Sequence, residues 1–150
     1  MSTTPDRARH DRGSALLEFI VVGVGILVPI AYLALTAAGV QSGAFASTQA
    51  VREAGRAFVT SATPVEGLAR AQVAARLAFD DHGIDLPSDA LRVTCTDGPC
   101  LAPGSTVLVQ VEWQAALPWL PGDLAGAAPR VVPIRATHRV PVDDFRGDPA

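Results

Sequence analysis

Few residues of this 150-residue sequence have the types and spacing that catalysis requires. The best candidate is the run Asp80-Asp81-His82, in which two carboxylates stand beside an imidazole, the groups used in general acid–base chemistry. These residues fall at the expected end of a helix, where a solvated terminus explains them better than a site does. The sequence holds no H-E-x-x-H, G-x-S-x-G, P-loop or dinucleotide-binding motif. We therefore expect no enzymatic activity, and we assign no catalytic residue, no metal and no cofactor.

The two cysteines, Cys95 and Cys100, flank the turn-forming residues 96–99. Two thiols at this spacing can form a local disulfide, which persists only in an oxidising compartment. Two reduced, buried cysteines are the alternative. A structural zinc site is a poor explanation, because it needs four ligands and the histidines lack finger spacing: His10, His82 and His138.

An apolar segment begins directly after a single carboxylate, Glu18. Residues 19–40 read FIVVGVGILVPIAYLALTAAGV, and only Tyr32 and Thr36 bring polar side-chain atoms. As a helix this segment is roughly 33 Å long, which is enough to cross the hydrocarbon core of a bilayer. A removable signal peptide fits less well, because its apolar region has only about 7–15 residues. We expect one transmembrane helix, with the lipid bilayer as a partner.

The charges around this segment are asymmetric. Three arginines precede it, at positions 7, 9 and 12, and no cation follows until Arg52, so the positive-inside rule places the N-terminus in the cytoplasm. Residues 41–150 carry nine arginines against twelve acidic residues, and the net charge of -3 belongs to them. This slightly acidic balance argues against nucleic acid as a partner, and nothing indicates a small-molecule substrate.

The junction Gly13-Ser14-Ala15-Leu16-Leu17-Glu18-Phe19 resembles the processing site of type IV prepilin-like proteins. The resemblance implies that a membrane-embedded prepilin peptidase cuts between Gly13 and Ser14. Ser14 then becomes the N-terminal residue, and Glu18 becomes the fifth mature residue. A carboxylate in a bilayer is costly unless it finds a partner, and the new amino group at Ser14, in the same chain or in a neighbouring subunit, would be one. Alternatively, Glu18 only occupies the first turn of a helix, where the dipole favours an anion.

The whole pattern resembles the TadE-like minor pseudopilins of tight-adherence (Flp-type) pilus systems. Their major pilins are very short and usually have Tyr where this chain has Phe19, and the related TadG-type proteins tend to be longer. The resemblance is strongest over residues 12–56 and weaker over Ala136-Thr137-His138-Arg139-Val140-Pro141-Val142-Asp143. It implies pilin or pseudopilin subunits and the pilus assembly platform as partners. The alternative is an unprocessed single-pass membrane protein whose outer domain binds an envelope or secretion-system partner.

Beyond the membrane, helical periodicity continues to about Val59. Gly39 and Gly43 have the small-x-x-x-small spacing that lets helices approach each other. Thr63, Pro64 and Glu66 predict the capped start of a second helix that ends at about Asp81. Its pattern predicts that the larger apolar residues face inward: Val65, Leu68, Ala69, Val73 and Leu77.

Alternating runs follow at Leu91–Cys95, Val107–Trp113 and Val131–Val142, and Pro133 and Pro141 restrict the third to a sheet edge or a broken strand. The fold class is therefore α+β, with two helices and a small antiparallel sheet of about three strands. The expected domains are a leader (1–13), a membrane span (14–40), a helical continuation (41–62), an extracytoplasmic domain (63–145) and a flexible tail (146–150). The apolar loop 117–121 is expected to fold onto the core, or to form a binding patch if exposed. The tripeptide Arg146-Gly147-Asp148 receives no function.

Overall fold

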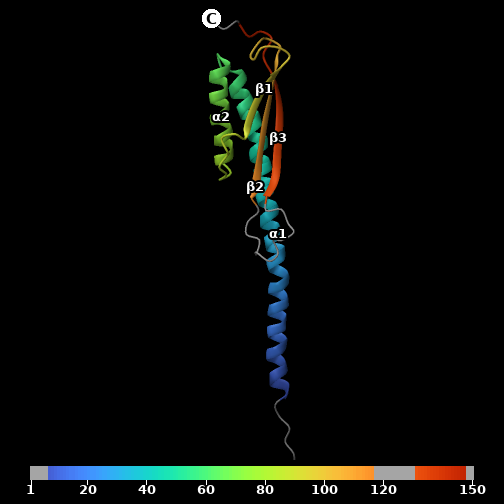
Figure 1. Cartoon of the computed structure of the whole chain (residues 1–150). Helices are drawn as coiled ribbons and strands as arrows, with labels where there is room; N and C mark the ends of the chain where they lie inside the picture. Colours follow the sequence, from blue (N-terminus) through green and yellow to red (C-terminus); the bar gives the residue numbers. More distant parts are fainter. Residues whose placement is uncertain (1–6, 117–130, 148–150) are drawn as a thin grey trace, which may run out of the picture. The chain divides into compact units, whose positions relative to one another are not determined.

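A computed structural model describes residues 7–116 and 131–147 of the chain, with side chains from Ala15 onward (Figure 1). The fold is α+β, as the sequence predicts, with two helices and a three-stranded antiparallel sheet. The elements follow in the order α1 (Arg7–Val59), α2 (Pro64–Asp80), β1 (Leu91–Thr96), β2 (Thr106–Ala116) and β3 (Val131–Pro141). The chain divides into two compact units inside α1, Met1–Ala38 and Gly39–Ala150.

The first unit is a helix that exposes apolar side chains all around. Its Leu, Ile, Val and Phe side chains between Leu16 and Leu35 are 51% to 75% exposed, whereas Tyr32 is half-buried. Pro29 lies inside the helix, and the hydroxyl of Thr36 donates a hydrogen bond of 2.8 Å to the carbonyl oxygen of Tyr32. By length and composition this helix can cross a membrane, where such internal hydrogen bonds replace those to water.

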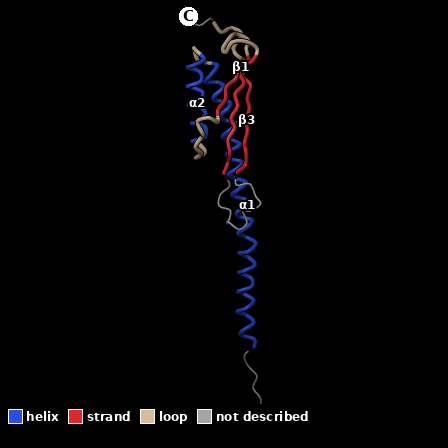
Figure 2. The backbone as a smooth tube through the Cα atoms, in the orientation of Figure 1, coloured by secondary structure: helices blue, strands red, loops and turns tan. Residues whose placement is uncertain are grey.

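In the second unit the helices pack on one face of the sheet (Figure 2). The strands are ordered β1-β2-β3, and both pairs are antiparallel, with Val109 opposite Val93 on one side and His138 on the other. The edge position of β3 confirms the interpretation of its two prolines. The residues of β2 that point toward the helices are buried: Val107, Val109 and Val111. They alternate with more exposed residues on the uncovered face.

The C-terminal part of α1 lies close against the sheet because its contact face consists of small residues. A Cβ atom added at Gly55 would lie 2.5 Å from Cγ2 of Val140, and one added at Gly43 would lie 2.7 Å from Cζ2 of Trp113. Between these positions the buried face continues through Ala46, Ala50 and Ala54, each 0% exposed. The backbone of α1 can therefore approach the strands more closely than larger residues would permit.

The orientation of α2 differs from the sequence prediction. The residues predicted to face inward are exposed, Val65 by 82%, Val73 by 66% and Leu77 by 61%, with Leu68 and Ala69 exposed as well. The buried face consists instead of Gly67, Ala71, Ala75, Ala78 and Phe79. The prediction is wrong because α2 lies close to α1, as the 3.0 Å between an added Gly67 Cβ and Cδ2 of Phe58 shows. At that separation small residues fill the interface.

Both helix ends at the α1–α2 connection have side-chain caps. The hydroxyl of Thr63 accepts a hydrogen bond from the backbone N–H of Glu66, and Pro64 occupies the first helical position, as predicted. The carboxylate of Glu66 pairs with Arg70 at 3.0 Å and leaves the capping box half made. At the end of α1, the guanidinium of Arg146 donates to the carbonyl oxygens of Val59 and Ser61.

Candidate functional site

The predicted processing residues lie near the start of α1. Gly13 and Ser14 have helical backbone, and Glu18 and Phe19 follow one turn later, both exposed. Ser14 and Glu18 are four residues apart, so they share one face of the helix. Glu18 makes no ion pair within the part of the chain that the structure describes. The structure thus leaves this carboxylate open to a partner.

The two glycines proposed for helix packing have different environments. Gly43 is buried in the second unit against Trp113 and Ile134. Gly39 is exposed, and a Cβ added there would meet nothing within 4 Å. The structure therefore uses Gly43 for contact with its own sheet, and of the pair only Gly39 is accessible to another chain.

The residues Asp80, Asp81 and His82 do not converge on one point. Asp80 ends α2, Asp81 is its C-cap, and both side chains are exposed. The imidazole Nδ1 of His82 lies 3.2 Å from the hydroxyl oxygen of Ser42, and this contact fastens the end of α2 to α1. Among the described residues no group of three or more His, Cys, Asp or Glu side chains gathers as metal ligands would.

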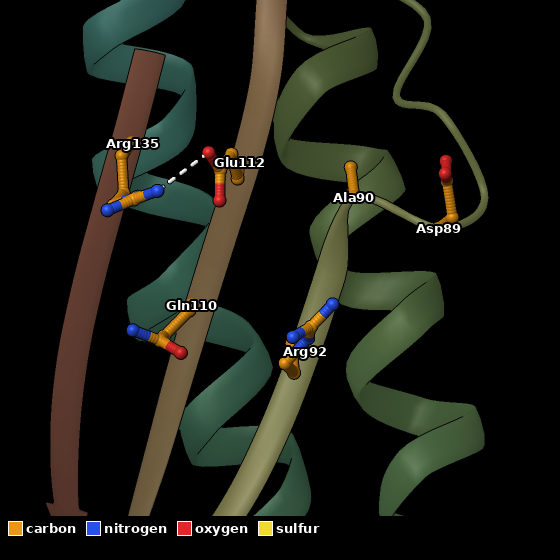
Figure 3. Close-up of a pocket in the computed structure, with 6 residues that line it drawn as sticks. All are labelled: Asp89, Ala90, Arg92, Gln110, Glu112 and Arg135. Carbon is orange, nitrogen blue, oxygen red and sulfur yellow. Dashed lines mark hydrogen bonds and ion pairs between the residues drawn. The ribbon is translucent and has the colours of Figure 1, made fainter. Parts of the chain in front are cut away.

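A shallow polar hollow of about 390 Å³ lies on the uncovered face of the sheet (Figure 3). In it the Nη2 atom of Arg135 lies 2.7 Å from Oε1 of Glu112, and this hydrogen bond and the carboxylate charge raise the pKa of the Arg135 guanidinium. The sequence alone does not predict this hollow, although the alternation of β1 and β2 puts its polar side chains on one face. Its lining consists of Asp89, Ala90, Arg92, Gln110, Glu112 and Arg135.

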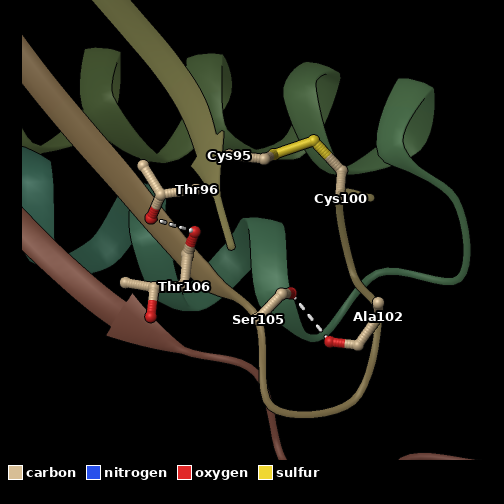
Figure 4. Close-up of a disulfide and its surroundings, with 6 residues drawn as sticks. All are labelled: Cys95, Thr96, Cys100, Ala102, Ser105 and Thr106. Carbon is tan, nitrogen blue, oxygen red and sulfur yellow. Dashed lines mark hydrogen bonds between the residues drawn. A yellow bond between two sulfur atoms is a disulfide. The ribbon is translucent and has the colours of Figure 1, made fainter. Parts of the chain in front are cut away.

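Cys95 and Cys100 form a disulfide with Cα atoms 5.3 Å apart (Figure 4). The sequence prediction of this pair agrees with the structure. Between β1 and β2 the loop has left-handed backbone at Asp97 and Leu101, with φ of 68° and 66°. Beside it, the hydroxyl of Thr96 donates to the carbonyl oxygen of Thr106 at 3.2 Å, so the bridge closes a loop whose strand ends are already paired.

Two further predictions involve residues that lie wholly or partly outside the ranges 7–116 and 131–147 that the structure describes. The apolar loop 117–121 lies outside the described residues, and its packing stays a prediction. Of the tripeptide Arg146-Gly147-Asp148, the arginine caps α1 and is partly buried, whereas residues 148–150 lie outside the description. An arginine held in this way is not presented as a ligand.

Comparison with known proteins identifies no relative. No model of a protein family matches the chain, and no curated protein or solved structure matches it either.

Proposed function

We propose that the protein is a TadE-like minor pseudopilin, held in the cytoplasmic membrane by residues 14–40, which acts in the assembly or structure of tight-adherence pili. The observation that carries this proposal is α1 itself. One stretch of the helix exposes apolar side chains on every side, and its last part forms the core of an α+β unit. A helix that serves as both anchor and core suits a subunit that is inserted in a bilayer and then packed against others.

The N-terminal residues supply the chemistry. Cleavage after Gly13 adds water across a peptide bond and leaves a free amino group on Ser14. This group lies at the new N-terminus of the helix, one turn before Glu18, whose carboxylate has no ion pair among the described residues. In an apolar environment an unpaired carboxylate is costly, so pairing with an amino group of the same or a neighbouring subunit favours one axial register.

The disulfide and the arginines support placing the second unit outside the cytoplasm. The disulfide between Cys95 and Cys100 persists in oxidising compartments. The three arginines before the apolar segment favour a cytoplasmic N-terminus. After mild reduction, a membrane-impermeant maleimide added to spheroplasts should label these cysteines, the only two in the chain. Labelling only after the cells are lysed would reverse the proposed topology.

Intact mass of the membrane-extracted protein tests the processing. In cells with a prepilin peptidase we expect residues 1–13 to be absent, and in cells without it we expect them to be retained. A Gly13→Leu variant should keep the leader, whereas Ser14→Ala should lose it. An uncut chain in peptidase-containing cells would contradict the proposal and favour the unprocessed single-pass protein with an envelope or secretion-system partner.

Substitution of the carboxylate tests the register role. Glu18→Ala should reduce pilus assembly strongly, and Glu18→Asp should retain part of it. Glu53→Ala, which removes an exposed carboxylate from the other part of α1, is the matched control and should leave assembly unchanged. Normal pili with Glu18→Ala would refute the register role.

A further inference from the structure

We propose that the uncovered face of the sheet binds the acidic turn of a second copy of this chain. The arginine face is defined by Arg92, Arg135 and Arg139, and the acidic turn by Asp80, Asp81 and Asp85. This inference rests on the proposed function and deepens it, because it names the contact between neighbouring subunits.

The arginine face concentrates positive charge on a unit that is acidic as a whole. Its three arginines are exposed on β1 and β3. Two carboxylates lie among them, Glu112, which pairs with Arg135 at 2.7 Å, and Asp89, which lines the same hollow, so the positive charges remain in excess by one. Arg92 and Arg139 make no ion pair among the described residues. The residues across from them on β2 are Gln110 and Leu108, which bring no compensating charge. Like charges on one sheet face repel, so an anionic surface would stabilise it.

The acidic turn carries unpaired negative charge at the negative end of a helix dipole. Asp80 and Asp81 end α2, where the helix dipole is negative, and the last turn of α2 contains no basic residue. Both side chains are exposed, as is Asp85, and none of the three forms an ion pair within the described ranges. Carboxylates at this end of a helix are unfavourable unless a cation approaches them.

The two charged sets of one chain are not paired with each other among the described residues. α2 contacts the covered face of the sheet, where the ring of Phe79 lies 5.3 Å from that of Trp113. On the opposite face Arg92 and Arg135 line the hollow (Figure 3), and Arg139 is exposed four residues further along β3, on the same face as Arg135. Because no ion pair joins the two sets within the described part of one chain, we assign their contact to two copies. Because the contact joins different patches, it leaves one of each free and can propagate, as a subunit of a growing assembly requires.

The absence of lysine from this chain allows a direct test. In Arg139→Lys the new amine is the only side-chain amine, and a carbodiimide joins it to a carboxylate within contact distance, with loss of water to the reagent. We expect the detergent-extracted full-length variant to give a covalent dimer in which Lys replaces Arg139 and is linked to Asp80, Asp81 or Asp85. Arg52→Lys, on the exposed side of α1, is the control and should give no such dimer.

Charge reversal tests the same contact without a reagent. Arg92→Glu with Arg139→Glu, and separately Asp80→Arg with Asp81→Arg, should each raise the dissociation constant of the solubilised chain at least about fivefold. An equimolar mixture of the two variants should recover association, because each supplies the charge that the other lacks. High salt should weaken association of the original chain.

Three results would overturn the inference. They are cross-links only to carboxylates outside residues 80–85, association unchanged by both reversals, and binding of the arginine face to anionic vesicles in place of a second copy. The proposed function fails separately: a specific cross-link in a chain that keeps its leader would retain the contact and remove the pilus role. A processed chain that gives no cross-link would retain the pilus role and remove the contact.

Discussion

Trp113 joins three elements of the second unit through one side chain. Its indole N–H donates a hydrogen bond of 2.8 Å to the hydroxyl of Ser47 on α1, and its ring meets that of Phe79 on α2 edge to face at 83°. Ser47 in turn donates to the carbonyl oxygen of Gly43 at 2.7 Å. The half-buried tryptophan thus combines apolar packing with a satisfied polar atom.

Removal of the Ser47 hydroxyl should show how much its hydrogen bond with the Trp113 indole contributes to stability. Ser47→Ala leaves the indole N–H without its acceptor, so we expect the free energy of unfolding to fall by about 1–3 kcal/mol. Thr48→Ala is the matched control, because its hydroxyl is exposed and bonds only within the helix, and should change stability by less than about 0.5 kcal/mol. Urea unfolding followed by tryptophan fluorescence measures both, and equal effects would exclude the special role of Ser47.

Alanine substitutions at Gly43 and Gly39 should change the free energy of unfolding in opposite directions. Gly43→Ala should lower the free energy of unfolding by about 1–3 kcal/mol, because the added Cβ meets Trp113 at 2.7 Å. Gly39→Ala meets nothing within 4 Å and should raise it by about 0.5–1 kcal/mol through better helix propensity. The same unfolding measurement applies. A stabilising Gly43→Ala would mean that the helix lies farther from the sheet.

At the scale of elements, the strands were more predictable from the sequence than the second helix. Alternation located β1, β2 and β3, and the prolines placed β3 at an edge, because a strand with one buried face shows its period directly. The face of α2 was not predictable by the same logic. Side-chain size suggested Val73 and Leu77 as core, yet alanines fill the closely spaced contact with α1. The small-x-x-x-small spacing of closely packed helices is present in α2, at Gly67, Ala71 and Ala75, but it indicates the buried face only once the partner helix is known.

The corrected face of α2 can be tested by substitution. Leu77→Gln, at a side chain that is 61% exposed, should change the free energy of unfolding by less than about 0.5 kcal/mol. Ala75→Leu, at a position that is 0% exposed, should lower it by about 1–3 kcal/mol through overpacking, although leucine favours helices. Thermal unfolding of the two variants side by side gives the order. If Leu77→Gln is the more damaging change, the sequence prediction is restored.

The polar hollow depends on the register between strands, which a single sequence does not reveal. Alternation puts Arg92, Gln110 and Glu112 on the outer face, but only the register between strands brings them together. The disulfide needed no such information, because its two cysteines are neighbours in sequence. Local pairs were predictable, whereas the site built across strands was not.

At the scale of the molecule, every residue of the buried core lies in the second unit, from Ala46 onward. A chain of residues 39–150 should therefore fold without residues 1–38. We expect it to be soluble, to keep the Cys95–Cys100 disulfide and to unfold cooperatively in urea. Near-ultraviolet circular dichroism would detect the packing of Trp113. A noncooperative transition with no near-ultraviolet signal would mean that the core needs the first unit.

The close contact between α1 and the sheet also has a mechanical consequence. In the proposed pseudopilin, a pull on the membrane segment would reach the second unit through α1, which packs against the strands from Gly43 to Phe58. Such a force loads the packed face in shear, so its contacts must yield together and not one after another. The two hydrogen bonds from Arg146 to the end of α1 share that load at the far end. The small residues that bring the backbone close to the sheet thus make the last part of α1 difficult to draw out of the second unit.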